Sequence, residues 1–300
     1  MTPRTTYSAS ALGGHVDTPA PITGNTPGGD LRSDLHIVPG GHRRNPLAKK
    51  GLISALASLA LLALALAIWE LASRRLALPA LLLPPPSAVA AALWKGMTSG
   101  YFRPHLLATT WNLALGLALG CGIGFLAGIA LAESAALRRL LWPWVVVSQV
   151  IPKLALMPLF ILWFGFGHTS LVVITALICF FPLLETTATC LRQVPPERLE
   201  LFRMLGASRW QTLWQLKLPT GLPGVLAGLR VAVMLALVGA VVGEFIGASQ
   251  GLGALVIAAQ GSMDTPLMFA VLVLIAVLGV VAYQLTLWFE AALLRRHDLT

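Results

Sequence analysis

Residues 200–219, ELFRMLGASRWQTLWQLKLP, form a polar and basic segment between two long apolar runs. The run before it ends near Leu191, and the run after it begins near Leu222. A chain that crosses a membrane has little reason to place such a segment there unless something outside the lipid binds it. The segment therefore predicts a membrane-spanning scaffold that presents a contact surface to a partner.

The composition of the whole chain is that of an integral membrane protein. Of its 300 residues, 57% are hydrophobic and 11% are charged, whereas soluble domains are about a quarter charged. Each crossing of the ~30 Å hydrocarbon layer takes about 20 apolar residues in a helix. The net charge of +9 would favour nucleic-acid binding in a soluble chain. In a membrane chain the basic residues decide orientation instead, so we predict a lipid bilayer and no nucleic acid as the surroundings.

The first 47 residues differ from the rest of the chain. They are rich in glycine, proline, serine and threonine and have almost no apolar clusters, so they cannot bury enough surface to offset the entropy of ordering. The first strongly apolar run begins only near Leu52, which argues against a signal peptide. We predict a disordered cytoplasmic tail at 1–47 and a six-span transmembrane domain at 48–300.

Six apolar runs predict the fold class, an all-α membrane protein with six transmembrane helices. Each is about the length that one crossing needs. A proline-rich stretch and a short amphipathic helix at 87–94 separate the first two. The expected spans are 51–71, 106–131, 141–164, 169–191, 222–246 and 267–287.

The basic residues orient these spans. They concentrate before the first span, between the second and third, between the fourth and fifth, and after the sixth. By the positive-inside rule both termini and the 192–219 loop are cytoplasmic, which requires an even number of spans. The connection after the first span is the one exception, since it also holds Arg74, Arg75, Lys95 and Arg103.

Glycines at intervals of four residues predict close helix packing. The second span carries four of them on one helix face, a pattern that lets two backbones approach closely in lipid. The fifth span continues the theme, and the contact could lie within one subunit or between two. The glycines are Gly116, Gly120, Gly124 and Gly128, then Gly224, Gly228, Gly239, Gly243 and Gly247.

The third and fourth spans are the predicted walls of a translocation pathway. They contain prolines, and broken helices are tolerated at membrane depth mainly where they face protein or a water-filled cavity. Gln149, Lys153 and Glu185 fall inside these spans, and a charge at mid-bilayer costs about 2.5–3.5 kcal/mol. We predict that the three line the pathway and that Lys153 favours an anionic or carbonyl-rich substrate. The alternative is that Lys153 bonds to carbonyls freed by the prolines or pairs with Glu185. The prolines are Pro143, Pro152, Pro158 and Pro182.

No catalytic or metal-binding pattern is found in the sequence. It lacks a GxxxxGK[ST] phosphate loop and an HExxH motif. Cys121, Cys179 and Cys190 have no metal-binding spacing and are read as small core residues, and His168 as an ordinary interfacial residue. Another intramembrane acid, Glu244, lies near the outer end of the fifth span. We therefore predict no catalytic residues, no metal site and no enzyme.

The opening segment reads as a helical hairpin at about 195–219. A first helix runs to about Leu205, and Gly206 ends it in the left-handed conformation that glycine favours. Ser208 and Gln211 are a capping-box pair that begins a second short helix, which Pro219 is expected to stop. The alternative is an amphipathic loop that only lies on lipid.

The hairpin resembles the EAA loop of the permease subunits of bacterial ABC importers. The loop's glutamate, glycine and proline match Glu200, Gly206 and Pro219, with Leu216 and Leu218 as the apolar approach, whereas Leu201 and Phe202 replace the two alanines. Three longer stretches are similar to the nitrate/sulfonate/taurine branch of that family, and the likeness covers about residues 50–295. They are IPKLALMPLFILWFGFG (151–167), GASRWQTLWQLKLP (206–219) and GAVVGEFIGASQGLG (239–253).

The resemblance implies a type I ABC importer permease fold in the bacterial cytoplasmic membrane. Two permease subunits, expected to form a homodimer, would enclose the pathway. Separate cytoplasmic ATPase subunits would use the ATP, and an extracytoplasmic binding protein would deliver the solute. The chain itself would hold no cofactor. The hairpin would be the coupling site to the ATPase, through Glu200, Arg203, Gly206, Ala207, Ser208 and Pro219.

The resemblance also implies a small anionic solute of the sulfonate, nitrate or taurine kind, with a pyrimidine precursor or another small organic as the alternative. A secondary carrier driven by an ion gradient remains the alternative mechanism. It would transport without ATP or a partner, but the sequence shows neither inverted-repeat symmetry nor repeated intramembrane carboxylates.

Overall fold

The computed structural model describes residues 46–75 and 83–297, and within these ranges every regular element is helical. The chain divides into two compact units, 1–56 and 57–300. In the first unit only the beginning of a helix is described, so the predicted tail at 1–47 lies almost wholly outside the described residues. All that follows concerns the second unit.

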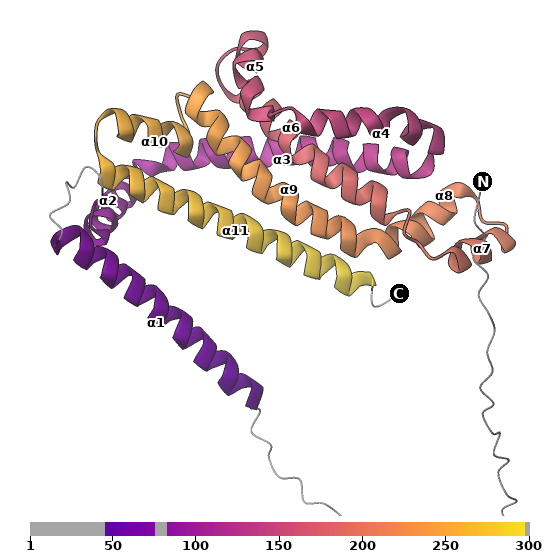
Figure 1. Cartoon of the computed structure of the whole chain (residues 1–300), viewed down its shortest axis with the longest axis horizontal. Coiled ribbons are helices and arrows are strands. Elements are labelled where there is room, and N and C mark those ends of the chain that lie inside the picture. Colours follow the sequence, from indigo (N-terminus) through magenta and orange to yellow (C-terminus); the bar gives the residue numbers. More distant parts are fainter. Residues whose placement is uncertain (1–45, 76–82, 298–300) are drawn as a thin grey trace, which may run out of the picture. The chain divides into compact units, whose positions relative to one another are not determined.

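The elements follow one another as short and long helices (Figure 1). The long ones are α1 (Pro46–Arg75), α3 (Phe102–Glu133), α6 (His168–Cys190), α9 (Leu218–Gly247) and α11 (Thr265–His297). Between them lie α2 (Pro86–Thr98), α4 (Ala135–Val150), the 3-10 turn η1 (Lys153–Leu156), α5 (Met157–Phe164), α7 (Pro196–Met204), α8 (Arg209–Thr212), the π-helical turn η2 (Leu213–Lys217) and α10 (Leu252–Gly261).

The predicted six-span, all-helical fold is confirmed, with one span broken. Five of the described helices are long and apolar enough to cross a membrane, and α4 with η1–α5, bent by 84° at the break, makes a sixth when the pair is counted as one span. The span expected at 141–164 is therefore two helices joined at a break, at one of the prolines that the sequence places there. Pro152 has no N–H to continue α4, and proline disfavours the helical conformation of the residue before it. Ile151 is accordingly extended, with φ −69° and ψ 124°.

The glycines of α3 pack on α6. A Cβ at Gly116 would lie 2.5 Å from Thr175 Cγ2, and one at Gly128 would lie 2.6 Å from Thr187 Cβ. At Gly124 an added Cβ would lie 2.5 Å from the carbonyl oxygen of Phe180. The two helix backbones therefore approach too closely for any other residue at these positions. The predicted small-residue contact is confirmed, and it lies within the subunit.

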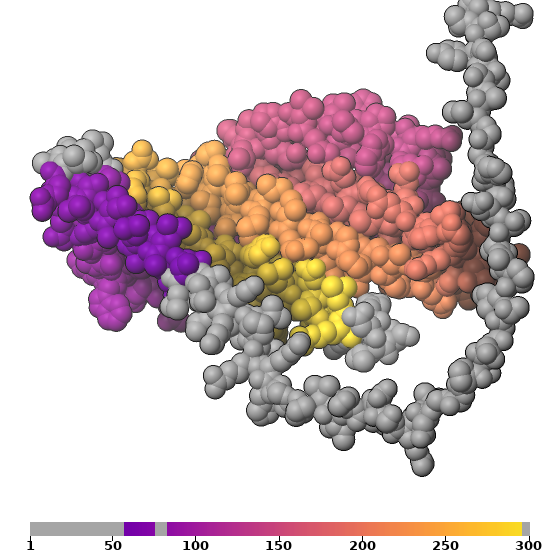
Figure 2. Space-filling model, turned by 60° about the horizontal axis from the view of Figure 1, so that its bottom comes forward, coloured from indigo at the N-terminus to yellow at the C-terminus, as the bar shows by residue number. Residues whose placement is uncertain are grey.

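Helix α9 contacts α6 through glycines as well. A Cβ at Gly239 would lie 2.9 Å from Ile178 Cδ1, and one at Gly243 would lie 3.1 Å from a methyl group of Leu171. On another side α9 contacts α11, where Arg230 forms an ion pair of 3.3 Å with Glu290; Figure 2 shows these two helices side by side. Helix α6 is thus held between α3 and α9, with its buried face at the core of the unit.

Two segments differ from the expectation. Pro219 does not stop a helix, because α8, η2 and α9 follow without a break and Pro219 lies at the start of α9. The π-helical turn accommodates the proline, because the Leu218 N–H already bonds to the Leu213 carbonyl five residues back and Pro219 has no N–H that needs a partner. The connection after α9 is not a plain loop: it contains α10, whose Leu252 and Leu255 are buried with Phe102 and Val271 in a second core.

Candidate functional site

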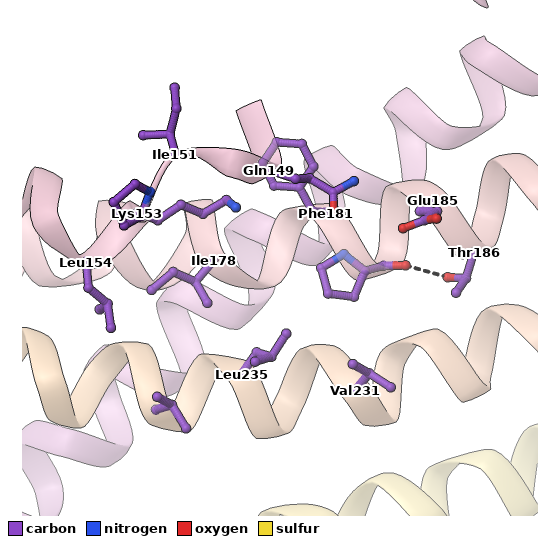
Figure 3. Close-up of a pocket in the computed structure, with 13 residues that line it drawn as sticks. Gln149, Ile151, Lys153, Leu154, Ile178, Phe181, Glu185, Thr186, Val231 and Leu235 are labelled. Atoms are coloured by element: carbon purple, nitrogen blue, oxygen red, sulfur yellow. Dashed lines mark hydrogen bonds between the residues drawn. The ribbon is translucent and has the colours of Figure 1, made fainter. Parts of the chain in front are cut away.

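The break between α4 and η1 forms one wall of a cavity of about 580 Å³ (Figure 3). Helix α6 supplies the second wall and α9 the third. The prolines at the break and inside α6 both border the cavity, as the pathway prediction requires. The lining residues are Gln149, Ile151, Pro152, Lys153, Leu154, Ile178, Phe181, Pro182, Glu185, Thr186, Val231, Leu235 and Val238.

All three predicted pathway residues line this cavity. The Lys153 Nζ lies 4.5 Å from the centroid of the Phe181 ring, a cation–π contact. Gln149 comes from the last turn of α4, beside that ring in Figure 3, and Glu185 lies farther along α6. Among the described residues neither charged side chain has an ion pair, so Lys153 and Glu185 are not bonded to each other. The cavity thus presents a cation, an anion and an amide on otherwise apolar walls.

The hairpin adopts the predicted turn. Gly206 has φ +70°, its N–H donates to the Arg203 carbonyl at 3.0 Å, and the Ala207 N–H donates to the Phe202 carbonyl at 3.0 Å. This pair of bonds is the Schellman motif, which ends α7 and reverses the chain. The capping box is also present, since Ser208 Oγ accepts from the Gln211 N–H at 3.2 Å and Gln211 Oε1 accepts from the Ser208 N–H at 2.8 Å.

The predicted coupling residues are spread over this hairpin and the start of α9. Glu200, Arg203, Gly206 and Ser208 are exposed, and Ala207 is half-buried. Pro219 is half-buried as well, but η2 separates it from the turn. Apolar side chains surround the turn, with Met204, Leu205 and Trp210 at 87%, 73% and 67% exposure. The hairpin therefore ends in an apolar surface that no described residue of the second unit covers.

A buried polar network that the sequence reasoning missed lies at the other end of α9. The Glu244 carboxylate is fully buried and accepts hydrogen bonds from Thr109 Oγ1 at 2.9 Å, the Gly253 N–H at 2.9 Å and Asn112 Nδ2 at 3.3 Å. Because the Asn112 amide donates there, its Oδ1 accepts from His168 Nδ1, at 2.7 Å. The Glu244 carboxylate thus links α9 to α3 and α10, and Asn112 links α3 to the start of α6. The only sequence signal was an acid inside an apolar run.

Comparison with known proteins assigns the chain to a family. Residues 120–295 match the family described as the binding-protein-dependent transport system inner membrane component. The chain belongs to this family. Its members are transport permeases, so the cavity among the spans and the exposed hairpin are parts of a permease subunit. The predicted relationship to importer permeases is confirmed.

Several relatives cover most of the permease. The chain is 39% identical to the riboflavin transport system permease protein RibX of Chloroflexus aurantiacus, over 78% of this chain and 87% of that one. It is 35% identical to the formylaminopyrimidine transport permease protein ThiX of Halalkalibacterium halodurans, over 72% and 86%. It is 32% identical to the taurine transport system permease protein TauC of Escherichia coli, over 78% and 86%.

The fold of the permease is similar to that of a solved transporter. A chain of the MetNI methionine ABC transporter in an inward-facing conformation superposes with a TM-score of 0.55 at 21% identity. The match covers 62% of this chain and 93% of that one. At this identity the likeness concerns the fold alone.

Proposed function

We propose that this permease subunit forms the translocation pathway of an ATP-driven importer and that the cavity beside α6 is one wall of it. The observation that carries the proposal is the position of Gln149, Lys153 and Glu185 on that cavity. Glu185 and Gln149 are exposed and, among the described residues, have no hydrogen-bond partner. A charge facing lipid costs about 2.5–3.5 kcal/mol, whereas a water-filled pathway solvates it.

A second copy of the chain is proposed to close the cavity. At the broken end of α4, Val150 and Ile151 are 81% and 47% exposed beside the polar lining residues. One subunit therefore supplies only part of the wall, and a homodimer would place the same surface opposite it. A related permease subunit in the same position is the alternative.

The hairpin is proposed to couple this pathway to cytoplasmic ATPase subunits, which use the ATP. An exposed apolar surface of this kind marks an interaction site. Leu201, Met204, Leu205 and Trp210 would enter a groove on the ATPase, with the Gly206 turn at the tip. Because α8, η2 and α9 are continuous, a displacement of the hairpin would reach the cavity wall through α9. The alternative, a hairpin that lies on lipid, uses the same apolar side chains.

Orientation follows from the charges. We place both termini and the hairpin on the cytoplasmic side of the bacterial inner membrane, because the basic connections gather there. The opposite face, which includes α10, would then receive an extracytoplasmic binding protein that delivers the solute.

The solute is proposed to be small, and the cavity lining supports two classes of it. Lys153, which has no carboxylate partner in the described part of the chain, supports an anionic or carbonyl-rich group, as in the sulfonate, nitrate and taurine class. The Phe181 ring and the apolar walls instead support a flat heterocycle such as a pyrimidine precursor, with Glu185 to accept its N–H groups. Uptake of labelled taurine by the complete system, compared with uptake of labelled formylaminopyrimidine and of labelled riboflavin, would decide between the two classes.

The experiment that tests the coupling role is Gly206→Glu. No atom lies near a Cβ at this position, so the subunit should still insert, but the turn becomes strained and its tip gains a charge. We expect uptake to fall at least about tenfold while the ATPase subunits still hydrolyse ATP. The matched control is Gly100→Glu, since Gly100 has φ +73° and open space but lies between α2 and α3.

Normal uptake by Gly206→Glu would refute the coupling role. Transport by the purified chain alone in liposomes, without ATP or partners, would instead establish the secondary-carrier alternative.

A further inference from the structure

A second hollow, of about 560 Å³, lies where α3 ends, α4 begins and the hairpin folds back. It is distinct from the cavity beside α6 and shares no lining residue with it. Its charged lining residues are Glu133 from the end of α3, Arg203 from α7, Arg209 from α8 and Lys217 from η2. Four separate elements therefore bring ionised groups to one concave surface.

The charges of this hollow do not balance. Lys217 Nζ lies 2.6 Å from Glu133 Oε1, and this half-buried ion pair neutralises both groups. The guanidinium groups of Arg203 and Arg209 form no ion pair or hydrogen bond among the described residues. Two guanidinium groups thus remain without a counter-charge on the same surface.

The beginning of α4 adds to the positive potential. Ser134 and Ala135 line the hollow, and the 16-residue helix that starts there has the partial positive charge of its N-terminus at this point. The Ser134 side chain accepts from the Leu137 N–H at 3.2 Å, and the N–H groups of Ala135 and Ala136 before it have no intrahelical partner. Guanidinium groups and helix N-termini together are the donors that bind phosphate oxygens.

We propose that this hollow binds a phosphate group, carried by the headgroup of an anionic phospholipid or by a soluble phosphate compound. Arginine binds phosphate through two parallel N–H donors, a geometry that a lysine does not offer. The hollow is also large enough for a headgroup, and it lies at the end of a spanning helix, where basic pockets on the cytoplasmic side bind anionic lipids. Only the choice of leaflet rests on the orientation proposed above.

Phosphate binding here would bear on coupling as well. The same arginine, Arg203, lines the hollow and belongs to the hairpin, and Lys217 belongs to the continuous stretch that leads into α9. A bound phosphate would therefore link α4 to the hairpin and restrict the movement of one against the other.

The test uses the full chain, delipidated in detergent and titrated with phosphatidylglycerol, with phosphatidylcholine of the same acyl chains, or with sodium phosphate. Bound lipid is counted by native mass spectrometry and the melting temperature is followed in parallel. We expect saturable binding of phosphatidylglycerol, weaker binding of phosphatidylcholine, and a loss of affinity of at least about tenfold in the double variant Arg203→Gln with Arg209→Gln. Competition by sodium phosphate would identify a soluble phosphate as the ligand, and its failure to compete would identify the lipid.

The matched control is Arg198→Gln, which removes an exposed arginine of α7 that does not line the hollow. Arg209→Lys retains the charge and should lose only part of the affinity, because it lacks the paired donors. The substituted arginines are exposed, so the variants should melt at the wild-type temperature without lipid. Equal binding of the two lipids, or wild-type affinity in the double variant, would overturn the proposal. So would the complete absence of phosphate-dependent binding, the result expected if the hollow instead receives an acidic residue of a partner protein.

Discussion

Lys153 shows how one residue depends on a break in its helix. Pro152 ends the extended link after α4, and Lys153 begins η1 beside the cavity. The sequence-based alternative, an attachment of Lys153 to freed carbonyls or to Glu185, is not what the structure shows. The Lys153 ammonium group instead contacts the face of the Phe181 ring. This contact partly replaces the water that the ammonium group loses, and it leaves the N–H donors of Lys153 unused. The ammonium group is thus free to meet a solute.

Replacement of Lys153 by methionine should lower uptake by the complete transport system about tenfold, because a hydrogen bond to a charged group is lost. Methionine retains the length and the contact with the ring, so the subunit should remain folded. Uptake by cells that express the complete system is the measurement, with Lys95→Met on exposed α2 as the control. Unchanged uptake and unchanged substrate preference would exclude Lys153 from the pathway.

Glu244 is the residue whose role depends most on burial. In Glu244→Leu the donors of Thr109, Asn112 and Gly253 would lose their acceptor, and each unsatisfied buried group costs about 1–3 kcal/mol. Glu244→Gln retains the shape and one acceptor oxygen. We expect the melting temperature in detergent to fall in the order wild type, Gln, Leu. A leucine variant as stable as the wild type would show that the network does not hold α10 in place.

Whether a contact could be predicted depended on how far apart its two residues lie in the sequence. Gly206 and Ser208 were read correctly because their hydrogen bonds join residues three to five positions apart. The partners of Glu244 were not, because Thr109 and Asn112 precede it by 135 and 132 positions. No local pattern records such a contact.

At the scale of elements, the glycine ridge of α3 permits a direct test. Gly124→Leu would force a side chain against the Phe180 backbone, and overpacking of this kind costs about 1–3 kcal/mol or more. Gly122 lies on the same helix with no atom near a Cβ, so Gly122→Leu should be neutral or slightly stabilising.

The measurement is the melting temperature of the two variants in the same detergent. A large loss in Gly124→Leu alone would show that α3–α6 packing, and not glycine content, sets the stability. Equal effects of the two substitutions would contradict the packing that the structure shows.

The short elements were the hardest to predict. Helix α10 has 10 residues, too few to cross a membrane, and sequence reasoning treated it as a connection. Tertiary contacts, a buried leucine pair and the Glu244 network, make it a helix that packs into the core. The second hairpin helix was likewise expected to stop at Pro219, but the π-helical turn η2 carries the chain into α9.

At the scale of the molecule, the open cavity makes the second subunit testable. Val150→Cys, in a background with the three natural cysteines replaced by alanine, should cross-link between subunits with a bis-maleimide in membranes. A dimer that closes the cavity brings the two exposed ends of α4 together. Val280→Cys on α11, also exposed, is the control and should not cross-link. Cross-linking by Val280→Cys and not by Val150→Cys would place the subunit interface on α11, away from the cavity.

The membrane class, the six apolar spans, the hairpin turn and the family could be read from the amino-acid sequence. These follow from composition, from helix-length apolar runs and from caps a few residues long, all of which are local properties. The packed structure was needed to show that Gln149, Lys153 and Glu185 share one cavity and that α3 and α9 both pack on α6. It also placed Arg203 and Arg209 in one hollow and buried Glu244 between α3 and α10. Side chains on separate helices meet only after packing, and in lipid that packing depends on the fit of small residues between backbones, which the order of apolar residues along the chain does not record.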